Sequence, residues 1–484
     1  MRGKYRLVLC SFIFLFLCTG TALSASLAPD EEWSRMYGKE GYYSIRYVQE
    51  VDDGGYILAG SFQPYELTDD YEDYLLIKTD SAGNEEWNKT FGGIHYQSAC
   101  SATQTRDGGY ILAGADEIRG LNGWVVKTDS EGEEEWNRTF REEQENFLRS
   151  VQQTSDGRYI FAGGINSLSA SGYDAWVIKT DSNGNEEWNK TFGGTSPENA
   201  YFIQETTDGG YILACGMYSF DADTHTAWLV KTDSKGNEEW SRYFANPDYG
   251  YNQVNSVKET EDGGYILAGI TRPSGTYKEG KAWIIKTNSN GYEKWSRTFN
   301  KGDYISVYSI QQTSDGGYAF AGYSELSVPD RHDSWLIKTD PDGYEEWNKT
   351  FQNADDSFIN CIQETRDKGY VLAGFLRVEG GLYRPWLIKL TGEKYPEDPL
   401  SEVKELKDYI CTLENLDNST KTVLTVRLEN TIHRLEKGET EKAVSKLEQF
   451  TDSVNKLNLQ NKLSADQANN LIQKTQRIIE LIEK

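Results

Sequence analysis

The sequence predicts a mainly β fold, namely a seven-bladed β-propeller that is closed by its N-terminal strand and followed by a small α-helical bundle. Three observations support this: a repeat of about 52 residues, four strand-like segments in each repeat, and complementary ends of the repeat region. A chain of 484 residues is too long for one ordinary core. A large repeat domain with a smaller companion domain is therefore expected.

Each repeat has two recurring parts. An Asp-Gly-Gly turn, or a close variant, precedes Tyr-Ile-Leu-Ala-Gly, and a Trp-aliphatic-Ile-Lys-Thr-Asp run leads through a polar turn to Glu-Glu-Trp-Asn-Lys-Thr-Phe. The first part occurs seven times, with its aspartate at Asp53, Asp107, Asp156, Asp208, Asp262, Asp315 and Asp367. Short runs of β-branched and aromatic residues between Gly, Asn and Asp turns predict four antiparallel strands per repeat. This length and strand number are typical of a propeller blade.

The two ends of the repeat region complement each other. The seventh repeat stops at 386–390 and lacks its Glu-Glu-Trp strand, whereas Glu31, Glu32 and Trp33 stand near the other end. The N-terminal strand is therefore expected to complete the last blade and to remove an open sheet edge. All 13 tryptophans occupy two repeat positions, which indicates that they are core wedges between blades.

Residues 1–25 have the features of a signal peptide, because basic residues precede an apolar run over 7–18 and small residues follow it. The protein is therefore expected to be secreted or at the cell surface. The further expected divisions are a propeller over 26–390, a linker over 391–400 and a helical domain over 401–484. No other stretch approaches the roughly 20 apolar residues of a membrane span, so no transmembrane segment is expected in the mature chain.

Charge and cysteine usage exclude several classes of function. Most of the net charge of -26 falls on the repeat region, and such a field repels phosphate backbones, so nucleic acid is not an expected partner. The cysteines beyond the signal peptide are Cys100, Cys215, Cys361 and Cys411. Their spacing fits neither a disulfide framework nor a metal site. No cofactor or metal is expected.

The repeats resemble two groups of known propellers. Their layout is similar to kelch-type blades, although Ala-Gly here replaces the Gly-Gly pair at the end of the second strand. The pattern "DGGYILAG…WLIKTDSNGNEEWNKTFGG" is more similar still to repeats of prokaryotic, notably archaeal, cell-surface propeller proteins, over about 31–390. This resemblance implies a fold and an extracellular address, but no particular ligand.

Beyond the repeats the pattern becomes helical, with apolar residues recurring at three and four positions. Helices are expected over 401–414, 419–436, 440–457 and 465–483, and together they predict a small four-helix core. Residues from about 402 to 483, with the run "LENTIHRLEKGETEKAVSKLEQFTDSVNKL", resemble the FIMAH-type domain at the C-termini of prokaryotic extracellular proteins. The resemblance implies an accessory role in attachment or oligomerisation.

The loops predict which face of the propeller binds. One face carries the connections between first and second strands and those between third and fourth strands, and these are almost constant in length. The connections on the opposite face vary. Varied loops on a rigid ring are where recognition usually occurs. Aromatic and acidic residues in them suit a sugar or a basic protein patch. The candidate binding residues are Tyr65, Asp69, Asp70, Tyr71, Phe220, Asp221, Asp223, Asp248, Tyr249, Tyr251 and Tyr277.

A catalytic constellation is not evident. The histidines His95, His225, His332 and His433 occupy no equivalent repeat positions and have no metal spacing, and the Asp-Ser-Asn-Gly-Asn turn lacks the ligand order of a calcium loop. No enzyme activity and no catalytic residue are expected. Sequons of the Asn-x-Ser/Thr type make the chain a candidate glycoprotein, at Asn88, Asn137, Asn189, Asn348 and Asn418.

These observations favour an exported binding protein that recognises an extracellular glycan or protein through the variable loop face. The helical domain would then serve as a tether or spacer and associate with the cell envelope. One alternative is a structural envelope component without a discrete ligand. A second alternative is a polysaccharide hydrolase or lyase that uses acidic loop residues, because carboxylate pairs are defined by separation in space rather than by sequence.

Overall fold

A computed structural model describes residues 28–483 except for short segments, and the expected signal peptide over 1–25 lies outside the described residues. The undescribed segments within this range are 39–40, 65–71, 94–95, 118–120, 141–143, 168–171, 220–223, 277, 326–330, 352–355, 394–397, 414–415, 461 and 464. The chain divides into two compact units. One comprises Ser26–Pro396, and the other includes Glu397–Lys484.

In the described part of the first unit, 28 strands form seven four-stranded antiparallel meanders, numbered 1 to 7 below. Meanders 1 and 2 contain β2 (Tyr42–Glu50), β3 (Tyr56–Gln63), β4 (Asp73–Thr79), β5 (Glu85–Phe91), β6 (Gln97–Gln104), β7 (Tyr110–Asp116), β8 (Asn122–Thr128) and β9 (Glu134–Phe140). Meanders 3 and 4 contain β10 (Asn146–Gln153), β11 (Tyr159–Ser167), β12 (Gly172–Thr180), β13 (Glu186–Phe192), β14 (Glu198–Glu205), β15 (Tyr211–Ser219), β16 (Thr224–Thr232) and β17 (Glu238–Phe244).

Meanders 5 and 6 contain β18 (Tyr251–Glu259), β19 (Tyr265–Arg272), β20 (Lys281–Thr287), β21 (Glu293–Phe299), β22 (Asp303–Gln312), β23 (Tyr318–Glu325), β24 (Asp333–Thr339) and β25 (Glu345–Phe351). Meander 7 contains β26 (Ser357–Glu364), β27 (Tyr370–Arg377), β28 (Tyr383–Leu390) and, as its outermost strand, β1 (Glu31–Met36). The two ends of this unit therefore meet in one sheet, where Ser34 of β1 faces Ile388 of β28.

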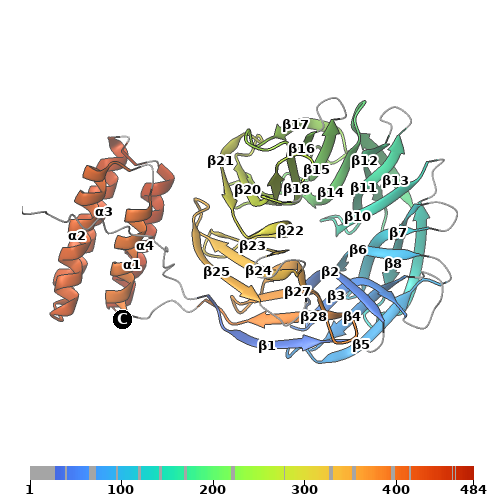
Figure 1. The fold of residues 1–484 in the computed structure, drawn as a ribbon, viewed down its shortest axis with the longest axis horizontal. Coiled ribbons are helices and arrows are strands. Elements are labelled where there is room, and N and C mark those ends of the chain that lie inside the picture. The colour runs from blue at the N-terminus through green and yellow to red at the C-terminus, as the bar shows by residue number, and fades with distance from the viewer. Residues whose placement is uncertain are drawn as a thin grey trace, which may run out of the picture. The chain divides into compact units, whose positions relative to one another are not determined.

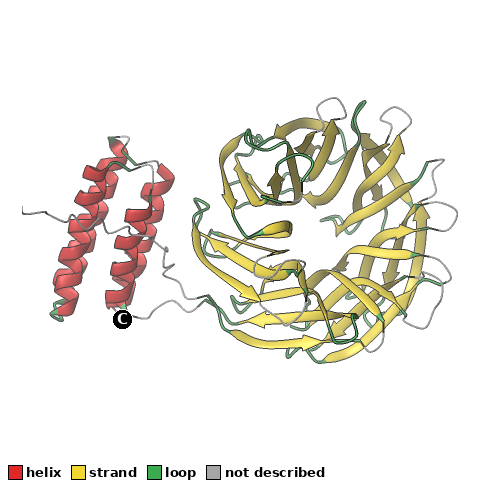
Figure 2. Ribbon diagram, in the orientation of Figure 1, coloured by secondary structure: helices red, strands yellow, loops and turns green. Residues whose placement is uncertain are grey.

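The meanders follow one another around a ring, with the first strand of each nearest the middle (Figure 1). Figure 2 shows that the regular elements of this unit are strands, joined by loops. Meanders 4 and 5 also share a single bridge between His225 and Tyr251, which joins them into one eight-stranded sheet.

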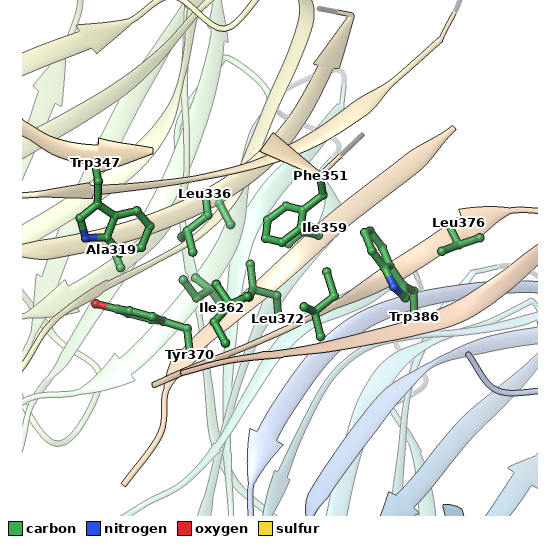
Figure 3. Close-up of a cluster of buried hydrophobic side chains, with 13 residues drawn as sticks. Ala319, Leu336, Trp347, Phe351, Ile359, Ile362, Tyr370, Leu372, Leu376 and Trp386 are labelled. Atoms are coloured by element: carbon green, nitrogen blue, oxygen red, sulfur yellow. The ribbon is translucent and has the colours of Figure 1, made fainter. Parts of the chain in front are cut away.

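The packing between meanders depends on an aromatic pair. A tryptophan from the outermost strand of each meander packs against the tyrosine that begins the second strand of the next, with ring centroids 5.7–6.1 Å apart. Trp33 of β1 makes this contact with Tyr56 of meander 1 at 5.8 Å. The apolar core lies between neighbouring meanders, as Figure 3 shows for meanders 6 and 7 around Trp347, Tyr370 and Trp386.

The constant length of the third-to-fourth turn is explained by the same packing. Gly184 in this turn has φ 76°, and a Cβ atom there would lie 2.6 Å from the Trp136 ring of the preceding meander. Only glycine combines this backbone conformation with room for the tryptophan. The turn therefore forms part of the junction between meanders.

A hydrogen bond also recurs at all seven junctions in the described ring. An N–H of the first-to-second turn donates to the carboxylate or amide at the end of the next meander's first strand, over 2.6–3.0 Å. Asp52 donates to Gln104 in this way, and Arg366 of meander 7 donates to Glu50 of meander 1. The junction that joins the chain's ends is thus built like the others.

Each meander also contains one buried lysine in its third strand. These lysines are Lys78, Lys127, Lys179, Lys231, Lys286, Lys338 and Lys389. Each ammonium lies 2.7–3.4 Å from the aspartate of the Asp-Gly-Gly turn. Five also contact a glutamate of the fourth strand, and for Lys389 this is Glu32 of β1 at 3.7 Å. A buried cation needs such partners, so the ion groups hold strands two to four together.

The second unit is a bundle of four helices. These are α1 (Pro399–Thr412), α2 (Asn418–Glu436), α3 (Thr440–Leu459) and α4 (Ala465–Glu483). Helix α1 packs against α2 and α4, and α3 packs against the same two helices. The buried core includes Leu406, Ile410, Leu424, Leu428, Leu447, Phe450, Val454, Leu471 and Ile478.

The prediction of a mainly β chain with a C-terminal helical region is confirmed. The first helix begins at Pro399, two residues before the expected 401, because the Asp398 side chain accepts the N–H groups of Leu400 and Ser401. The segment between β28 and α1 is correspondingly shorter than the expected linker over 391–400.

Candidate functional site

The first strands carry a repeated irregularity. In all seven meanders the register between the first and second strands shifts at one equivalent residue, which marks a β-bulge. The bulge residues are Arg46, Cys100, Arg149, Tyr201, Asn255, Tyr308 and Asn360. Bulges commonly redirect a side chain beside a functional site. Here they form a ring of seven side chains, which we call the bulge ring.

The bulge ring surrounds a central cavity of about 530 Å³, and all seven of its members line that cavity. Residues from every first strand contribute to the wall, together with Tyr323 of β23 and Phe375 of β27. Arg46, Arg149 and Tyr308 remain exposed within it. The volume lies within the range of roughly 300–1,000 Å³ that small-molecule sites occupy.

The position before the bulge does not vary in this way. The residue before it is aliphatic in every meander, as Ile45, Ala99, Leu148, Ala200, Val254, Val307 and Ile359. These side chains are buried in the core. Packing therefore constrains the flanking position, whereas the bulge position carries two arginines, two tyrosines, two asparagines and one cysteine.

Two guanidinium groups stand on one side of the bulge ring, in meanders 1 and 3. Arg149 lies over the rings of Phe147 and Tyr201, at 4.9 and 5.1 Å from their centroids. These aromatic contacts orient its guanidinium. Cys100 of meander 2 comes between Arg46 and Arg149 in the ring, and its side chain is the smallest of the seven.

Two asparagines on the other side of the bulge ring are tied to the next meander. The Asn255 amide donates to the Val307 carbonyl and that of Asn360 donates to Ile45, each over 2.7 Å. The Asn255 oxygen in turn accepts the Gln253 amide at 2.5 Å. These bonds hold the amides in place along the cavity wall.

A partly exposed cation lies three residues beyond the bulge. In four meanders this position is a glutamine whose side chain accepts a backbone N–H from the next meander over 2.6–3.0 Å, as Gln204 does from Glu259. Lys258 replaces the glutamine in meander 5 and cannot accept such a bond. Its ammonium lies 4.4 Å from the Phe202 ring centroid, and burial lowers the pKa of Lys258. Among the described residues, Lys258 forms no ion pair.

An amide donor beside Lys258 is also unpaired. Gln311 holds the equivalent position in meander 6, lines the cavity, and has its Nε2 atom buried without a hydrogen-bond partner among the described residues. A buried donor without a partner is costly to the fold. Lys258 and Gln311 therefore offer a cation and an N–H group to whatever enters the cavity.

Aromatic residues of meanders 6 and 7 lie beside the cavity wall. Phe358 packs between Tyr323 and Phe375, with ring centroids 4.7 and 4.9 Å apart, and His332 lies 5.1 Å from Phe358. Tyr323 and Phe375 both line the cavity, and each lies two residues before the end of the second strand that leads into a variable loop. The cavity and part of the predicted loop face are thus connected.

Three of the candidate binding residues belong to the described part of the chain. Asp248 and Tyr249 lie in the turn before β18, and Tyr251 is the first residue of that strand. The Tyr251 ring stacks 4.2 Å from His225 and lies under the Arg272 guanidinium. Its hydroxyl donates to Gln253, which lines the cavity, so Tyr251 adjoins the site.

The other candidate residues lie outside the described residues. They are Tyr65, Asp69, Asp70, Tyr71, Phe220, Asp221, Asp223 and Tyr277. Sequence reasoning did not identify the bulge ring, because the position appears as one variable residue inside an otherwise ordinary strand. The available signal was the alternation of a constant aliphatic residue with a residue that changes from repeat to repeat.

The sequons lie on exposed positions. Asn88, Asn137, Asn189 and Asn348 are exposed on fourth strands, and each donates to the glutamate three residues before it over 2.5–2.7 Å. Asn418 is exposed at the start of α2. Their modification stays a prediction.

A cluster of three carboxylates occurs at one lysine group. Asp315, Glu346 and Glu393 approach one another closely enough to hold a cation. The Lys338 ammonium already lies 2.7 Å from Asp315 and 2.8 Å from Glu346. Its positive charge offsets part of the negative charge of this cluster.

Comparison with known proteins identifies the second unit. The FIMAH domain family matches residues 400–480, which are the four helices described above. Residues 400–480 form a FIMAH domain. No curated protein matches the chain. Among the described helices, none combines the length and apolar character that crossing a bilayer requires.

Solved structures resemble this chain at low sequence identity. A protein of unknown function from Dyadobacter fermentans has a TM-score of 0.44 and 11% identity, covering 75% of this chain and 98% of that one. The β-propeller domain of the Trilobed protease from Pyrococcus furiosus has a TM-score of 0.42 and 13% identity, covering 74% and 98%. A sialidase from Trypanosoma rangeli has a TM-score of 0.39 and 9% identity, covering 77% and 59%. The fold itself rests on the strands: seven four-stranded meanders arranged around a ring give the first unit a β-propeller-like fold of many strands.

Proposed function

We propose that the protein is exported and acts at the cell surface, or in secreted form, as a binding protein for an extracellular glycan or protein. Its scaffold is a seven-bladed propeller in which each meander is a blade and β1 closes the ring. Support comes from the junction between meanders 7 and 1, which repeats the aromatic pair and the hydrogen bond of the other junctions. The FIMAH domain is the tether or spacer that associates with the envelope. The archaeal-type and kelch-like resemblances of the repeats agree with this role.

The observation that carries the proposal is the bulge ring. Seven equivalent residues differ in chemistry, line one cavity of about 530 Å³ and follow a residue that is aliphatic in every blade. The residue before the bulge serves the packing and is aliphatic in every blade. The diversity of the bulge residue itself is therefore best explained by contacts with a ligand.

The two alternatives have less support. A structural envelope component has no need of a polar, diversified cavity. A polysaccharide hydrolase or lyase of the usual kind needs a carboxylate pair at the substrate. The cavity wall, over the residues that are described, contains neither aspartate nor glutamate. We therefore propose binding without catalysis.

A binding screen of the full mature chain tests this function, with immobilised envelope glycans and envelope proteins as the probes. The site variant is Tyr201→Ala combined with Asn255→Ala, and the matched control is Asn88→Ala, which changes an exposed amide on an outer strand. We expect binding by the native chain and the control, and loss in the site variant. Absence of binding by the native chain, together with ordered self-assembly, would overturn the proposal in favour of a structural role.

A further inference from the structure

The charge of the cavity is opposite to that of the protein. The chain has a net charge of -26, yet Arg46, Arg149 and Lys258 line the cavity, and no carboxylate does so among the described residues. A cleft lined by one sign of charge with low-dielectric walls concentrates ions of the opposite sign. The excess of acidic residues elsewhere makes this local reversal informative, because chance alone would favour acidic groups.

The cations occupy two levels along the first strands. Arg46 and Arg149 belong to the bulge ring on either side of the small Cys100, which leaves space between their guanidinium groups. Lys258 lies three residues beyond the ring on β18, with Gln311 at the equivalent position of the next blade. Guanidinium groups pair with carboxylates through two parallel N–H bonds, and an ammonium adds a point charge.

The structural cost of Lys258 also favours an anionic ligand. The glutamine found at this position in four other blades accepts a backbone N–H, whereas Lys258 cannot accept that bond and places a partly exposed ammonium on the cavity wall. Its contact with the Phe202 ring is the partner that the wall provides. Local departures from a structural rule are expected at functional sites, and a bound anion would supply the missing ionic partner.

The remaining wall suits a sugar. Tyr201, Tyr308, Tyr323 and Phe375 provide aromatic faces, and Asn255 and Asn360 add amide groups. Aromatic rings can pack against the C–H faces of a sugar while amides bond its hydroxyls. The cavity is too small for a folded protein surface and of ordinary size for a small ligand.

We propose that the cavity binds an acidic sugar, namely a carboxylate-bearing residue at the end of a glycan chain, whose anion lies among Arg46, Arg149 and Lys258. This inference rests on the proposed binding function and specifies its ligand class. Arg46 and Arg149 hold the carboxylate through their N–H groups, Lys258 adds its positive charge, and Gln311 donates to an acceptor oxygen of the sugar. The aromatic side chains flank the sugar ring.

Titration calorimetry on the full mature chain tests the ligand class. The probes are oligogalacturonate, neutral oligogalactose and oligoglutamate, and the variants are Arg149→Gln and Lys258→Gln. Lys258→Gln installs the residue that other blades use, so the fold is retained, and the exposed Lys235→Gln is its matched control. We expect oligogalacturonate alone to bind. Each cavity variant should bind it about tenfold more weakly than the native chain, and the control variant should bind it with unchanged affinity.

The possible results separate this inference from the proposed function. Equal binding of oligogalactose, or affinity unchanged in Lys258→Gln and Arg149→Gln, would overturn the acidic-sugar inference while leaving a binding role. Preferential binding of oligoglutamate would overturn it in favour of an acidic peptide. Failure of all three probes would overturn the inference, and the screen with envelope glycans and envelope proteins would then decide the function by itself.

Discussion

Two sets of residues recur in all seven repeats: the buried lysines of the third strands and the bulge ring of the first strands. Their patterns of variation are opposite. The lysine is present in every blade and always contacts the turn aspartate. The bulge residue takes four different identities, and the cation Lys258 beyond it has no carboxylate partner in the described part of the chain. Paired charge thus accompanies the repeated framework, and unpaired charge accompanies the proposed site.

The largest expected effect tests whether the framework includes the N-terminal strand. Trp33→Ala should lower the free energy of unfolding by about 3 kcal/mol, because it removes the aromatic wedge against Tyr56. Trp87→Ala removes the equivalent wedge at another junction and should cost a similar amount. Chemical denaturation followed by circular dichroism measures both. A cost for Trp33→Ala far below that of Trp87→Ala would contradict closure by β1.

The second effect compares two lysines of the framework. Lys338→Met should cost about 3 kcal/mol, because it leaves Asp315 and Glu346 without their buried cation. Lys179→Met should cost less, since Lys179 has one carboxylate partner at 3.4 Å and burial lowers its pKa. The same denaturation experiment ranks the two variants.

The two lysines should also differ in their dependence on pH. Burial opposes the charge of Lys338, but Glu346 and Asp315 outweigh it and raise its pKa. Its contribution should be complete below the ordinary lysine pKa and decline as the pH rises through the higher folded value. Lys179, whose pKa is lowered, should add stability as the pH rises towards the ordinary value. If Lys338→Met and Lys179→Met each changed the free energy of unfolding by an amount that did not depend on pH, this assignment would be contradicted.

A third effect concerns the variable side of the ring. Burial, followed by the neighbouring Asp174 carboxylate, raises the pKa of Glu198 to about 7. Because the folded state binds this proton more tightly than the unfolded state, stability should fall as the pH rises from about 4.5 to 7. Glu198→Gln should remove this dependence and stabilise the protein by about 2 kcal/mol at pH 8. Thermal denaturation at pH 5 and pH 8 measures the change.

The second blade offers the reverse experiment. There Gln97 holds the position of Glu198 and Asp73 that of Asp174, and both side chains lie beside Gly92. The Gln97 amide also donates to Asp116 over 3.1 Å. Gln97→Glu should therefore introduce a loss of stability between pH 5 and pH 8. A stability that remains independent of pH in this variant would show that the carboxyl pair is not the cause.

The smallest effect sharpens the contrast at Lys258. Lys258→Gln should raise the free energy of unfolding by about 1 kcal/mol, because the new amide can accept a backbone N–H as Gln204 does from Glu259. The exposed Lys235→Gln should leave it unchanged. A destabilised Lys258→Gln protein would mean that the lysine contributes to the framework and not to the site.

Much of the fold could be predicted from the sequence, because its determinants repeat. The Asp-Gly-Gly turns, the tryptophan positions and the helical periodicity after 400 correspond to local contacts that each repeat makes for itself. The match of Glu31, Glu32 and Trp33 to the strand missing from the last repeat likewise pointed to the pairing of β1 with β28.

The candidate site could be predicted only in part. Tyr251 was recognised as an aromatic loop residue, and its hydroxyl leads through Gln253 to the cavity. The bulge ring was not recognised, because a bulge depends on the register between two strands and leaves no composition signal. Arg46 and Arg149 are about one hundred residues apart in the sequence and line one cavity only when the ring forms.

Protection of Cys100 tests the central claim most directly, because this bulge residue lies between the two arginines that line the cavity. The rate of its alkylation would be measured with and without saturating oligogalacturonate, in a Cys411→Ser chain, since Cys411 is exposed and Cys215 and Cys361 are buried. The account predicts that the ligand slows the reaction at Cys100 at least tenfold. An unchanged rate would contradict the claim that the bulge ring forms the binding site.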